Sequence, residues 1–318
     1  MTLLQLRVAS ASCEAKDVMR VELAAADGGE LPPFTPGAHL ALSLANGMQR
    51  QYSLVNDWRE RHRYVLGVGL APNGRGGSAF VHAQFRPGIQ VESSLPVNNF
   101  ALEPDAQRYL FIAGGIGVTP ILAMVQWCEA GGKPWKLVYA TRSRVRLAFY
   151  ETLAAFGTRV KFHCDDDSGG PLNVKAVMAD VSPGTHVYCC GPAPLMEAVQ
   201  QAGGHLGPDG LHFEWFSAPA SDGAVAHVND DGFWIDLKQS GRSLHVPGGQ
   251  SILEVLEQSG YELPFSCREG VCGTCETTVC AGEPDHRDYV YSPAQREGLR
   301  TMLICVSRAR SPRLQLDL

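Results

Sequence analysis

The chain has 318 residues, of which 45% are hydrophobic and 19% charged, and its formal net charge is −6. A chain of this length and composition can bury several cores, which excludes intrinsic disorder and predicts two or three globular domains. The acidic balance argues against nucleic acid as a partner. No stretch approaches the roughly 18 uncharged apolar residues of a spanning helix, and residues 1–7 lack the parts of a secretory signal. We therefore expect a cytoplasmic protein without a membrane partner.

Up to about Glu103, short strand-like segments alternate with turns rich in Gly and Pro. Such segments lie at 20–23, 39–44 and 64–68. Regular spacing of such short strands predicts a six-stranded antiparallel β-barrel over residues 1–104.

Two motifs in this first segment suit a flavin mononucleotide. The strand 50–53, Arg-Gln-Tyr-Ser, offers a cation, an aromatic ring and a hydroxyl. The run 74–78, Gly-Arg-Gly-Gly-Ser, offers a second cation and consecutive backbone N–H groups for a dianionic phosphate. Each motif alone also fits an ordinary strand or loop. Their combination ahead of a nucleotide-binding segment favours FMN.

From Gln107 the pattern changes to apolar strands that lead through glycine-rich turns into helices. The expected elements are strands at 109–113, 135–140, 160–163 and 185–189 and a helix at 121–128. They predict a parallel α/β sheet over residues 105–217. Gly-Gly-Ile-Gly-Val-Thr-Pro at 114–120 and Cys-Gly-Pro at 190–192 each follow a strand. Helix N–H groups at such turns bind dinucleotide phosphates, although a plain strand-to-helix turn would also explain these residues.

A small polar stretch at 218–225 is interpreted as an interdomain linker before a C-terminal domain at 226–318. Within that domain, 233–237 and 243–246 alternate around a polar turn like a hairpin, and Ser251 is placed to cap an apolar-periodic helix at 252–258. This pattern predicts a small β-grasp.

Four cysteines of this domain have the ligand spacing of a plant-type [2Fe–2S] ferredoxin, C-x4-C-x2-C followed after twenty-nine residues by a fourth. They are Cys267, Cys272, Cys275 and Cys305. Two irons that share two sulfides need four thiolates, and Gly270 and Gly273 allow loop N–H groups to approach the sulfurs. Structural zinc is the alternative, but zinc sites usually space their cysteines as two similar pairs.

The remaining cysteines and the charge of the C-terminal domain have simpler interpretations. Cys280 is interpreted as a small buried residue rather than a ligand, and Cys13, Cys128 and Cys164 as core thiols in a reduced protein. Acids outnumber bases after Ala226. That excess suits either docking to a basic patch on a redox partner or ordinary solubilisation.

The order of these motifs, over essentially the whole chain, resembles the phthalate dioxygenase reductase family, which includes vanillate O-demethylase reductases. The resemblance implies FMN in the first domain, NADH in the second and a [2Fe–2S] cluster in the third. The implied FMN contacts are Arg50, Gln51, Tyr52, Ser53, Gly67, Arg75, Gly76, Gly77 and Ser78. The implied nicotinamide nucleotide contacts are Gly114, Gly115, Gly117, Thr119, Cys190, Gly191 and Pro192.

The resemblance also implies a reaction centre made by Ser53, Cys190 and Phe216. Phe216 ends a Glu-x-Phe sequence whose aromatic ring covers the flavin in the family. As an alternative, Phe213, Trp215 and Phe216 could simply be the core of a strand.

One departure concerns the adenosine end of the nucleotide site. Arg142, Arg144 and Arg146 follow the second α/β strand, where an acidic residue favours NADH and an arginine favours the 2′-phosphate of NADPH. The family implies NADH, and NADPH stays open.

The three modules together predict an electron relay rather than acid–base catalysis. A hydride carries two electrons and the cluster accepts one, so a flavin must stand between them. We expect the reductase component of a two-component Rieske oxygenase that acts on aromatic compounds. The alternatives are a reductase for a diiron monooxygenase or another acceptor, and a redox sensor without turnover.

Overall fold

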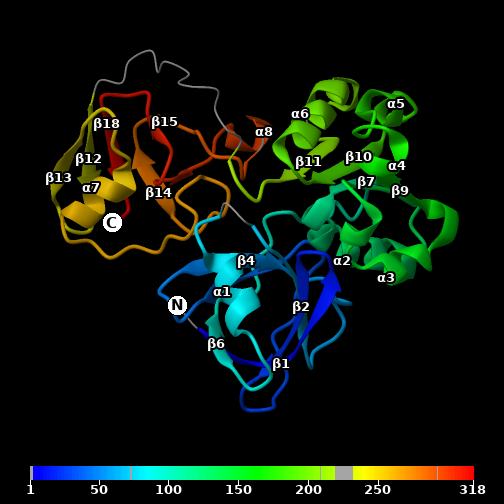
Figure 1. The fold of residues 1–318 in the computed structure, drawn as a ribbon. Helices are drawn as coiled ribbons and strands as arrows, with labels where there is room; N and C mark the ends of the chain where they lie inside the picture. The colour runs from blue at the N-terminus through cyan, green and yellow to red at the C-terminus, as the bar shows by residue number, and fades with distance from the viewer. Residues whose placement is uncertain (1–2, 72–73, 208, 219–231, 292) are drawn as a thin grey trace. The chain divides into compact units, whose positions relative to one another are not determined.

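The computed structural model describes residues 3–71, 74–207, 209–218, 232–291 and 293–318. These residues form two compact units, Met1–Glu214 and Trp215–Leu318. The first unit contains an antiparallel and a parallel sheet, and the second contains a mixed sheet, as Figure 1 shows. Among the described residues, no helix combines the length and apolarity needed to cross a bilayer. Except for Ala218, the predicted linker lies outside the described residues.

The antiparallel sheet has six strands in the order β4-β3-β6-β1-β2-β5. Its strands are β1 (Leu4–Ala15), β2 (Val18–Ala25), β3 (His39–Ser43), β4 (Gln49–Ser53), β5 (Tyr64–Gly69) and β6 (Gln90–Ser93). An isolated bridge between Leu54 and Leu66 joins the two edges of this sheet. Apolar side chains that alternate along the strands fill its interior, including Leu23, Leu40 and Leu66. The expected six-stranded antiparallel sheet is therefore present.

One helix in this segment was not expected. Helix α1 (Gly77–Gln84) starts inside the glycine-rich run that the sequence predicts as a loop. Gly76 precedes it with a φ of 86°, a left-handed conformation that glycine adopts without strain. The short helix gives the loop a set of free N–H groups at one end.

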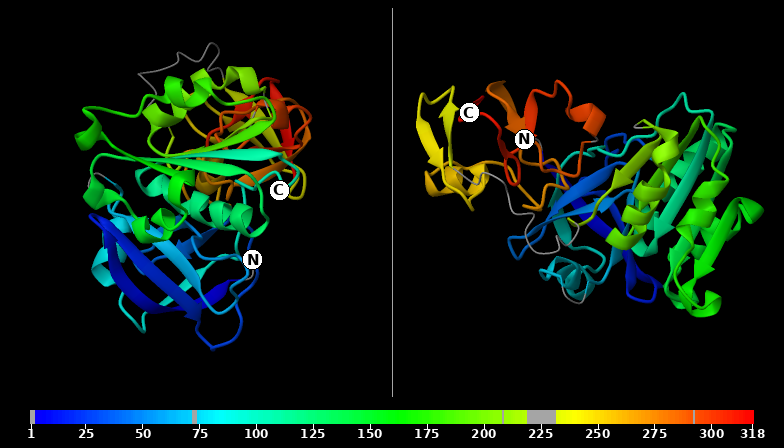
Figure 2. Two further views of the ribbon diagram at one scale, coloured as in Figure 1. Left: turned by 90° about the vertical axis from the view of Figure 1, so that its right-hand side faces the viewer. Right: turned by 90° about the horizontal axis from the view of Figure 1, so that it is seen from above.

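The parallel sheet has the order β11-β10-β7-β8-β9. Its strands are β7 (Arg108–Gly114), β8 (Trp135–Thr141), β9 (Val160–Cys164), β10 (Thr185–Cys190) and β11 (Leu211–Glu214). The helices are α2 (Val118–Ala130), α3 (Tyr150–Ala154), α4 (Asp165–Ser168), α5 (Val174–Ala179) and α6 (Ala193–Ala202). The crossovers through α2 and α6 lead in opposite directions from the centre of the sheet. Right-handed crossovers therefore place these helices on opposite faces, as in Figure 2.

Helix α2 belongs to a core that both sheets of the first unit share. Ile121 and Val125 of α2 pack in one buried group with Phe111 of β7 and with Val18 and Val65 of the antiparallel sheet. Helix α2 is apolar on nearly every side because it contacts both sheets. This shared core holds the predicted flavin and nucleotide modules in one compact unit.

The second unit has a five-stranded sheet in the order β13-β12-β18-β14-β16. Its strands are β12 (Phe233–Leu237), β13 (Ser243–Val246), β14 (Glu276–Ala281), β16 (Thr301–Leu303) and β18 (Arg313–Leu316), and β15 (Pro284–Asp285) pairs with β17 (Arg308–Ala309). Its helices are α7 (Ile252–Gln258) and α8 (Pro293–Arg296). The predicted hairpin and the Ser251 cap are confirmed, since Ser251 and Glu254 form a reciprocal capping box.

Candidate functional site

The two glycine-rich turns of the parallel sheet meet backbone to backbone. A Cβ on Gly117 would lie 2.2 Å from the carbonyl oxygen of Cys190, and one on Gly114 would lie 2.6 Å from Cδ of Pro192. Only glycine permits this approach. Gly115 has a φ of 55° and open space in front of its α-carbon. The turns therefore place the first residues of α2 and α6 together at the carboxyl edge of the sheet, where dinucleotides bind in α/β folds.

Gly67 has a packing explanation. A Cβ on Gly67 in β5 would lie 2.7 Å from the methyl group of Thr119 and 2.9 Å from the ring of Phe149. The Thr119 hydroxyl donates a hydrogen bond of 2.9 Å to the carbonyl oxygen of Ile116. Thr119 thus fixes the first turn of α2 and packs on β5, and the glycine at 67 is required by that close approach.

The half-buried residue Glu214 lies next to Cys190. Cys190 pairs with Glu214 in the parallel register of β10 and β11, and Cys190 is fully buried. Oε2 of Glu214 is buried and has no hydrogen-bond partner among the described residues. Burial raises the pKa of Glu214 to about 8, and burial together with the Glu214 charge raises the pKa of Cys190. Both shifts favour the neutral form of the group.

Sequence reasoning left Glu214 out of the site. Its only signal was its place in the Glu-x-Phe sequence. Ser53, at the end of β4, is buried. Phe216 belongs to the second unit and is 46% exposed, so it is not a core residue. The alternative that Phe216 is strand core is wrong, and its role over the flavin stays a prediction.

The chain offers an anion site at the start of α1. A Cβ on Gly77 would lie 2.3 Å from Nε of Arg50, so the arginine side chain lies directly across this glycine. Arg50 also reaches the carbonyl oxygen of Arg75 at 3.5 Å. Helix α1 has no side-chain cap, so its first N–H groups have no side-chain acceptor. The Arg50 guanidinium lies beside these groups. These groups fit the dianionic phosphate of FMN.

Tyr52 and Ser78 are also held in place near this site. Tyr52 packs against the core of the antiparallel sheet, and burial raises its pKa to about 12 in spite of the Arg50 charge. It stays a neutral aromatic donor. The Ser78 hydroxyl accepts a hydrogen bond of 3.1 Å from the Ala71 backbone N–H, which ties the start of α1 to the preceding loop. Gln51 lies beside Tyr52 in β4 and points to the other face of the sheet.

The four predicted cluster ligands come together in the second unit. The Cys267 thiol contacts those of Cys272 and Cys305, and Cys305 in turn contacts Cys275. The thiols of Cys272 and Cys305 lower the pKa of Cys267, and backbone donors including Glu269 add to this effect. The Glu269 N–H lies 3.3 Å from Sγ of Cys267. These interactions favour the thiolate of Cys267, the form that binds iron, while the same contacts raise the pKa of Cys272 and of Cys305.

The backbone of the cysteine loop, residues 267–275, also suits a cluster. Gly270 and Gly273 have φ values of 71° and 75°. The four thiols form one series of contacts, from Cys272 through Cys267 and Cys305 to Cys275, and two irons bridged by sulfides require four thiolates at such a place. We take the loop as able to hold the [2Fe–2S] group.

The other thiols differ from one another. Cys128 and Cys164 are buried as predicted, and burial raises the pKa of Cys128 to about 12. The prediction that Cys13 is a core thiol is wrong, because Cys13 is exposed. Around Cys13, strand β1 pairs with β2 alone and lies beyond the part that also pairs with β6. Cys280 is only half-buried.

Two of the three arginines behind the NADPH alternative already have acidic partners. Arg144 lies 2.7 Å from Asp167, and Arg146 lies 2.8 Å from Asp17. Arg142 is exposed. The local charge of this segment is therefore largely neutralised, which weakens the case for a 2′-phosphate site.

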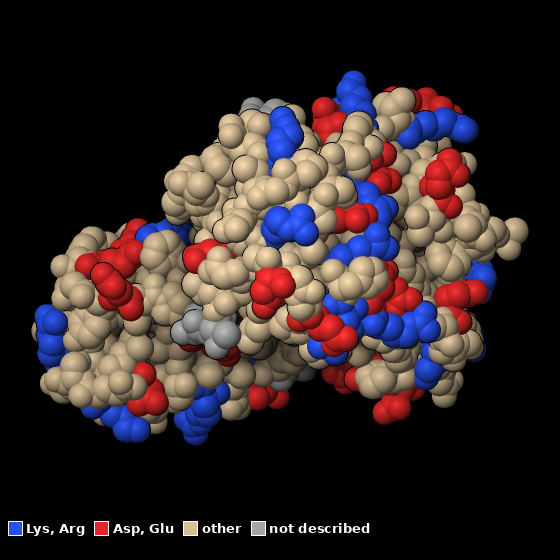
Figure 3. All heavy atoms as spheres, turned by 90° about the horizontal axis from the view of Figure 1, so that it is seen from below, with Lys and Arg blue, Asp and Glu red and all other residues tan. Residues whose placement is uncertain are grey.

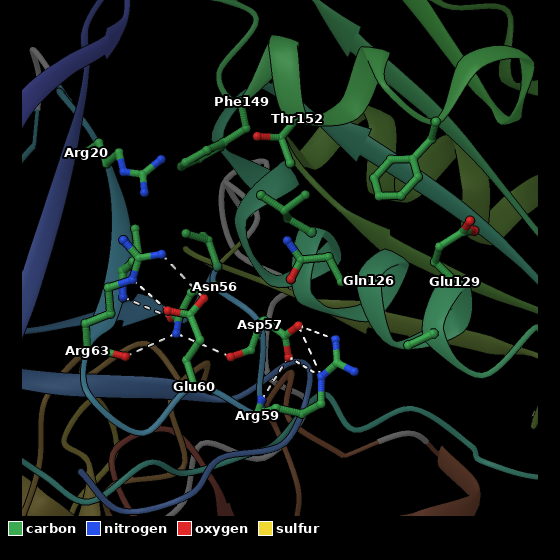
Figure 4. A pocket seen from close by; sticks show the side chains of 15 residues that line it. Arg20, Asn56, Asp57, Arg59, Glu60, Arg63, Gln126, Glu129, Phe149 and Thr152 are labelled. Atoms are coloured by element: carbon green, nitrogen blue, oxygen red, sulfur yellow. Dashed lines mark hydrogen bonds and ion pairs between the residues drawn. The ribbon is translucent and has the colours of Figure 1, made fainter. Parts of the chain in front are cut away.

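A cavity of about 620 Å³ lies elsewhere in the first unit, between the antiparallel sheet and helices α2 and α3. Figure 4 shows that several of its charged side chains are paired with one another. Arg63 binds Glu60 at 2.6 Å, and Arg59 binds Asp57. This cavity contains none of the predicted cofactor residues.

The fold and these sites define an iron–sulfur flavoprotein reductase that uses a nicotinamide nucleotide. Residues 235–310 match the family model of the 2Fe-2S iron-sulfur cluster binding domain, and residues 89–211 match that of the N-terminal domain of dimethylamine monooxygenase subunit DmmA-like proteins. The phenoxybenzoate dioxygenase subunit beta of Ectopseudomonas oleovorans is 44% identical over 98% of this chain and 97% of its own.

Solved structures agree with this class. A phthalate dioxygenase reductase, described as a modular structure for electron transfer from pyridine nucleotides to [2Fe–2S], is 40% identical over 99% of this chain and 98% of its own, with a TM-score of 0.71. An intact type IV self-sufficient cytochrome P450 monooxygenase is 35% identical over 99% of this chain with a TM-score of 0.91, and this chain spans 41% of its length. The chain belongs to the phthalate dioxygenase reductase family. It is an oxidoreductase of the FMN, NADH and [2Fe–2S] type.

Proposed function

We propose that this chain oxidises NADH and delivers electrons singly to a terminal Rieske oxygenase that acts on an aromatic compound. The observation that supports this most is that one chain carries three features together. They are the two glycine turns that meet at the edge of the parallel sheet, the anion site at the start of α1, and four cysteines with ferredoxin spacing. FMN, when bound, converts two-electron into one-electron chemistry, and the cluster passes on one electron at a time. A cytoplasmic location is part of this proposal.

The chain's own residues contribute binding and orientation. Arg50 and the start of α1 hold the flavin phosphate. The turns at Gly117 and Gly191 let the nucleotide approach the backbone, and Thr119 keeps that edge of the sheet packed on β5. The Glu214 carboxyl oxygens beside the buried Cys190 thiol can accept hydrogen bonds, and an acceptor suits a nicotinamide ring that gains positive charge as it gives up a hydride.

A Rieske partner is favoured by energetics. Plant-type clusters have potentials of roughly −400 mV, against roughly −150 to +300 mV for Rieske centres, so transfer in that direction is downhill. Figure 3 shows acidic and basic side chains interspersed on one face. That face does not favour a partner of one charge, and the acidic docking hypothesis stays open. A diiron or haem oxygenase would be the alternative acceptor.

Turnover with cytochrome c, which accepts one electron at a time, tests the relay. Wild type should reduce it catalytically with NADH. Cys272→Ser should lose most of this activity because a serine replaces a cluster ligand, whereas Cys280→Ser should keep it. If the protein reduces only as much cytochrome c as one reduction by NADH allows and then stops, it is a sensor. Oxidation of an aromatic substrate by the purified chain alone would contradict a reductase role.

A further inference from the structure

A fully buried carboxylate lies beside the cysteine loop. The Asp288 side chain has 0% exposure and belongs to the segment between β15 and α8. Burying a carboxylate costs free energy unless its oxygens are hydrogen-bonded. Asp288 is not one of the cluster ligands described above. The reason for its burial must therefore lie in the groups that its carboxylate binds.

One oxygen of Asp288 organises a tight turn. Oδ1 accepts hydrogen bonds from the backbone N–H groups of Val290, at 3.1 Å, and Tyr291, at 3.0 Å. Such Asx hydrogen bonds fix the backbone that follows the aspartate. We refer to residues 288–291 as the Asp288 turn.

The other side of this carboxylate is incompletely satisfied. Oδ2 lies 3.7 Å from Nδ1 of His286, and Arg296 donates to the carbonyl oxygen of Asp288 while its Nη2 lies 3.9 Å from Oδ1. Oδ2 of Asp288, Nδ1 of His286 and Nε of Arg296 have no hydrogen-bond partners among the described residues. Apolar side chains would often be more stable in such a place. Stability alone therefore does not explain the acid.

The Asp288 turn is attached to the cysteine loop at Gly270. The Tyr289 N–H donates a hydrogen bond of 2.8 Å to the Gly270 carbonyl oxygen. A Cβ on Gly270 would lie 3.1 Å from Cα of Asp288 and 2.6 Å from a methyl group of Val306. Gly270 stands between the ligands Cys267 and Cys272, and Val306 follows the ligand Cys305. The turn thus presses the middle of the loop against the strand end that bears the fourth ligand.

We propose that Asp288 is a positioning residue for the [2Fe–2S] cluster. Its Oδ1 holds the Asp288 turn, the turn holds Gly270 against Val306, and Gly270 sets the spacing of the loop N–H groups around the sulfurs. The requirement is for an acceptor at Oδ1, not for the negative charge. The inference rests on the four cysteines being the cluster ligands.

Asp288→Ala and Asp288→Asn, made in the full-length holoprotein, separate these effects. Asparagine keeps an acceptor at Oδ1 and removes the charge, and alanine removes both. We expect Asp288→Ala to change the g values of the reduced cluster in electron paramagnetic resonance and to speed loss of the cluster to a chelator at least fivefold. Asp288→Asn should keep the wild-type spectrum and a loss rate within twofold of wild type. Asp285→Asn, on the adjacent strand β15 and paired with Arg287, should behave as wild type.

Each result decides between positioning and simple stability. An alanine variant that unfolds at lower temperature but keeps wild-type g values and chelator kinetics overturns the proposal, as does an asparagine variant as impaired as alanine. If Asp288→Ala cannot be recovered with a cluster, Asp288→Glu keeps the charge and displaces the acceptor, and unchanged g values there overturn the proposal. A wild-type protein without the cluster signal contradicts the ligand assignment as well.

Discussion

The α-carbon of Gly117 lies so close to Cys190 that any side chain at 117 would overlap the Cys190 carbonyl oxygen, since a Cβ there would be only 2.2 Å away. Two turns some seventy residues apart in the sequence are thereby fixed to one another at the carboxyl edge of the parallel sheet. The contact brings two separate motifs together into one candidate nucleotide site.

Gly117→Ala should force these turns apart. We expect a loss of about 1–3 kcal/mol in the free energy of unfolding, as for other overpacked sites, together with a raised KM for NADH. Gly204→Ala is the matched control because a Cβ at that position meets nothing within 4 Å. Urea unfolding and steady-state kinetics with NADH measure both effects. Equal stability and equal KM for the two variants would show that the close approach is unimportant.

Glu214 should make stability depend on pH. Burial raises its folded pKa to about 8 from 4.5, so between these values the folded chain keeps a proton that the unfolded chain has lost. The free energy of unfolding contributed by Glu214 therefore falls as pH rises from 4.5 to 8, by at most about 1.4 kcal/mol per pH unit. Glu214→Gln should remove that slope. The control is Glu197→Gln, an exposed glutamate on α6, and urea midpoints from pH 5 to 8 give the comparison.

Arg50 should govern retention of the flavin. Its guanidinium lies across Gly77 at the start of α1, and charge-assisted hydrogen bonds to a phosphate contribute about 1.5–3 kcal/mol. Arg50→Gln should therefore weaken FMN binding about ten- to hundredfold, measured by fluorescence titration of the apoprotein. Arg59→Gln removes an arginine that pairs with Asp57 and should leave FMN affinity unchanged. Equal affinities for these two variants would move the phosphate site away from α1.

Asp167 should affect the choice between NADH and NADPH. It pairs with Arg144 at 2.7 Å on the surface, and exposed pairs are worth about 0–1 kcal/mol. Asp167→Asn would free Arg144 for a 2′-phosphate and should raise kcat/KM for NADPH up to about fivefold without changing that for NADH. Asp57→Asn, which breaks another Asp–Arg pair, provides the control. No change in the NADPH value would mean that the arginines lie outside the adenosine site.

Elements with a strong periodic pattern could be predicted from the sequence. The helix Ile252–Gln258 with its Ser251 cap and the apolar strands of the parallel sheet are examples, because local patterning and tertiary packing agree there. Helix α1 could not be predicted, since it is short and begins at two glycines that locally favour a turn. Cys13 was misplaced because its burial depends on where strand pairing ends.

Part of the candidate site could also be predicted from the sequence. The glycines and cysteines of the motifs could be found because their spacing is visible in the sequence. The raised pKa of Glu214 could not be read there, because it arises from burial against β10. Gly67 is among the FMN contacts that the family resemblance implies, but the groups that approach it include the side chains of Thr119 and Phe149, which the sequence does not reveal.

The most direct test of this account is an anaerobic titration of the purified holoprotein with NADH and, separately, with NADPH. The flavin and [2Fe–2S] absorption bands are followed together. The account predicts that NADH bleaches both bands and that NADPH does so only at much higher concentration. Bleaching of neither band by NADH would contradict the electron relay, and bleaching by NADPH alone would show that the arginine segment is a 2′-phosphate site.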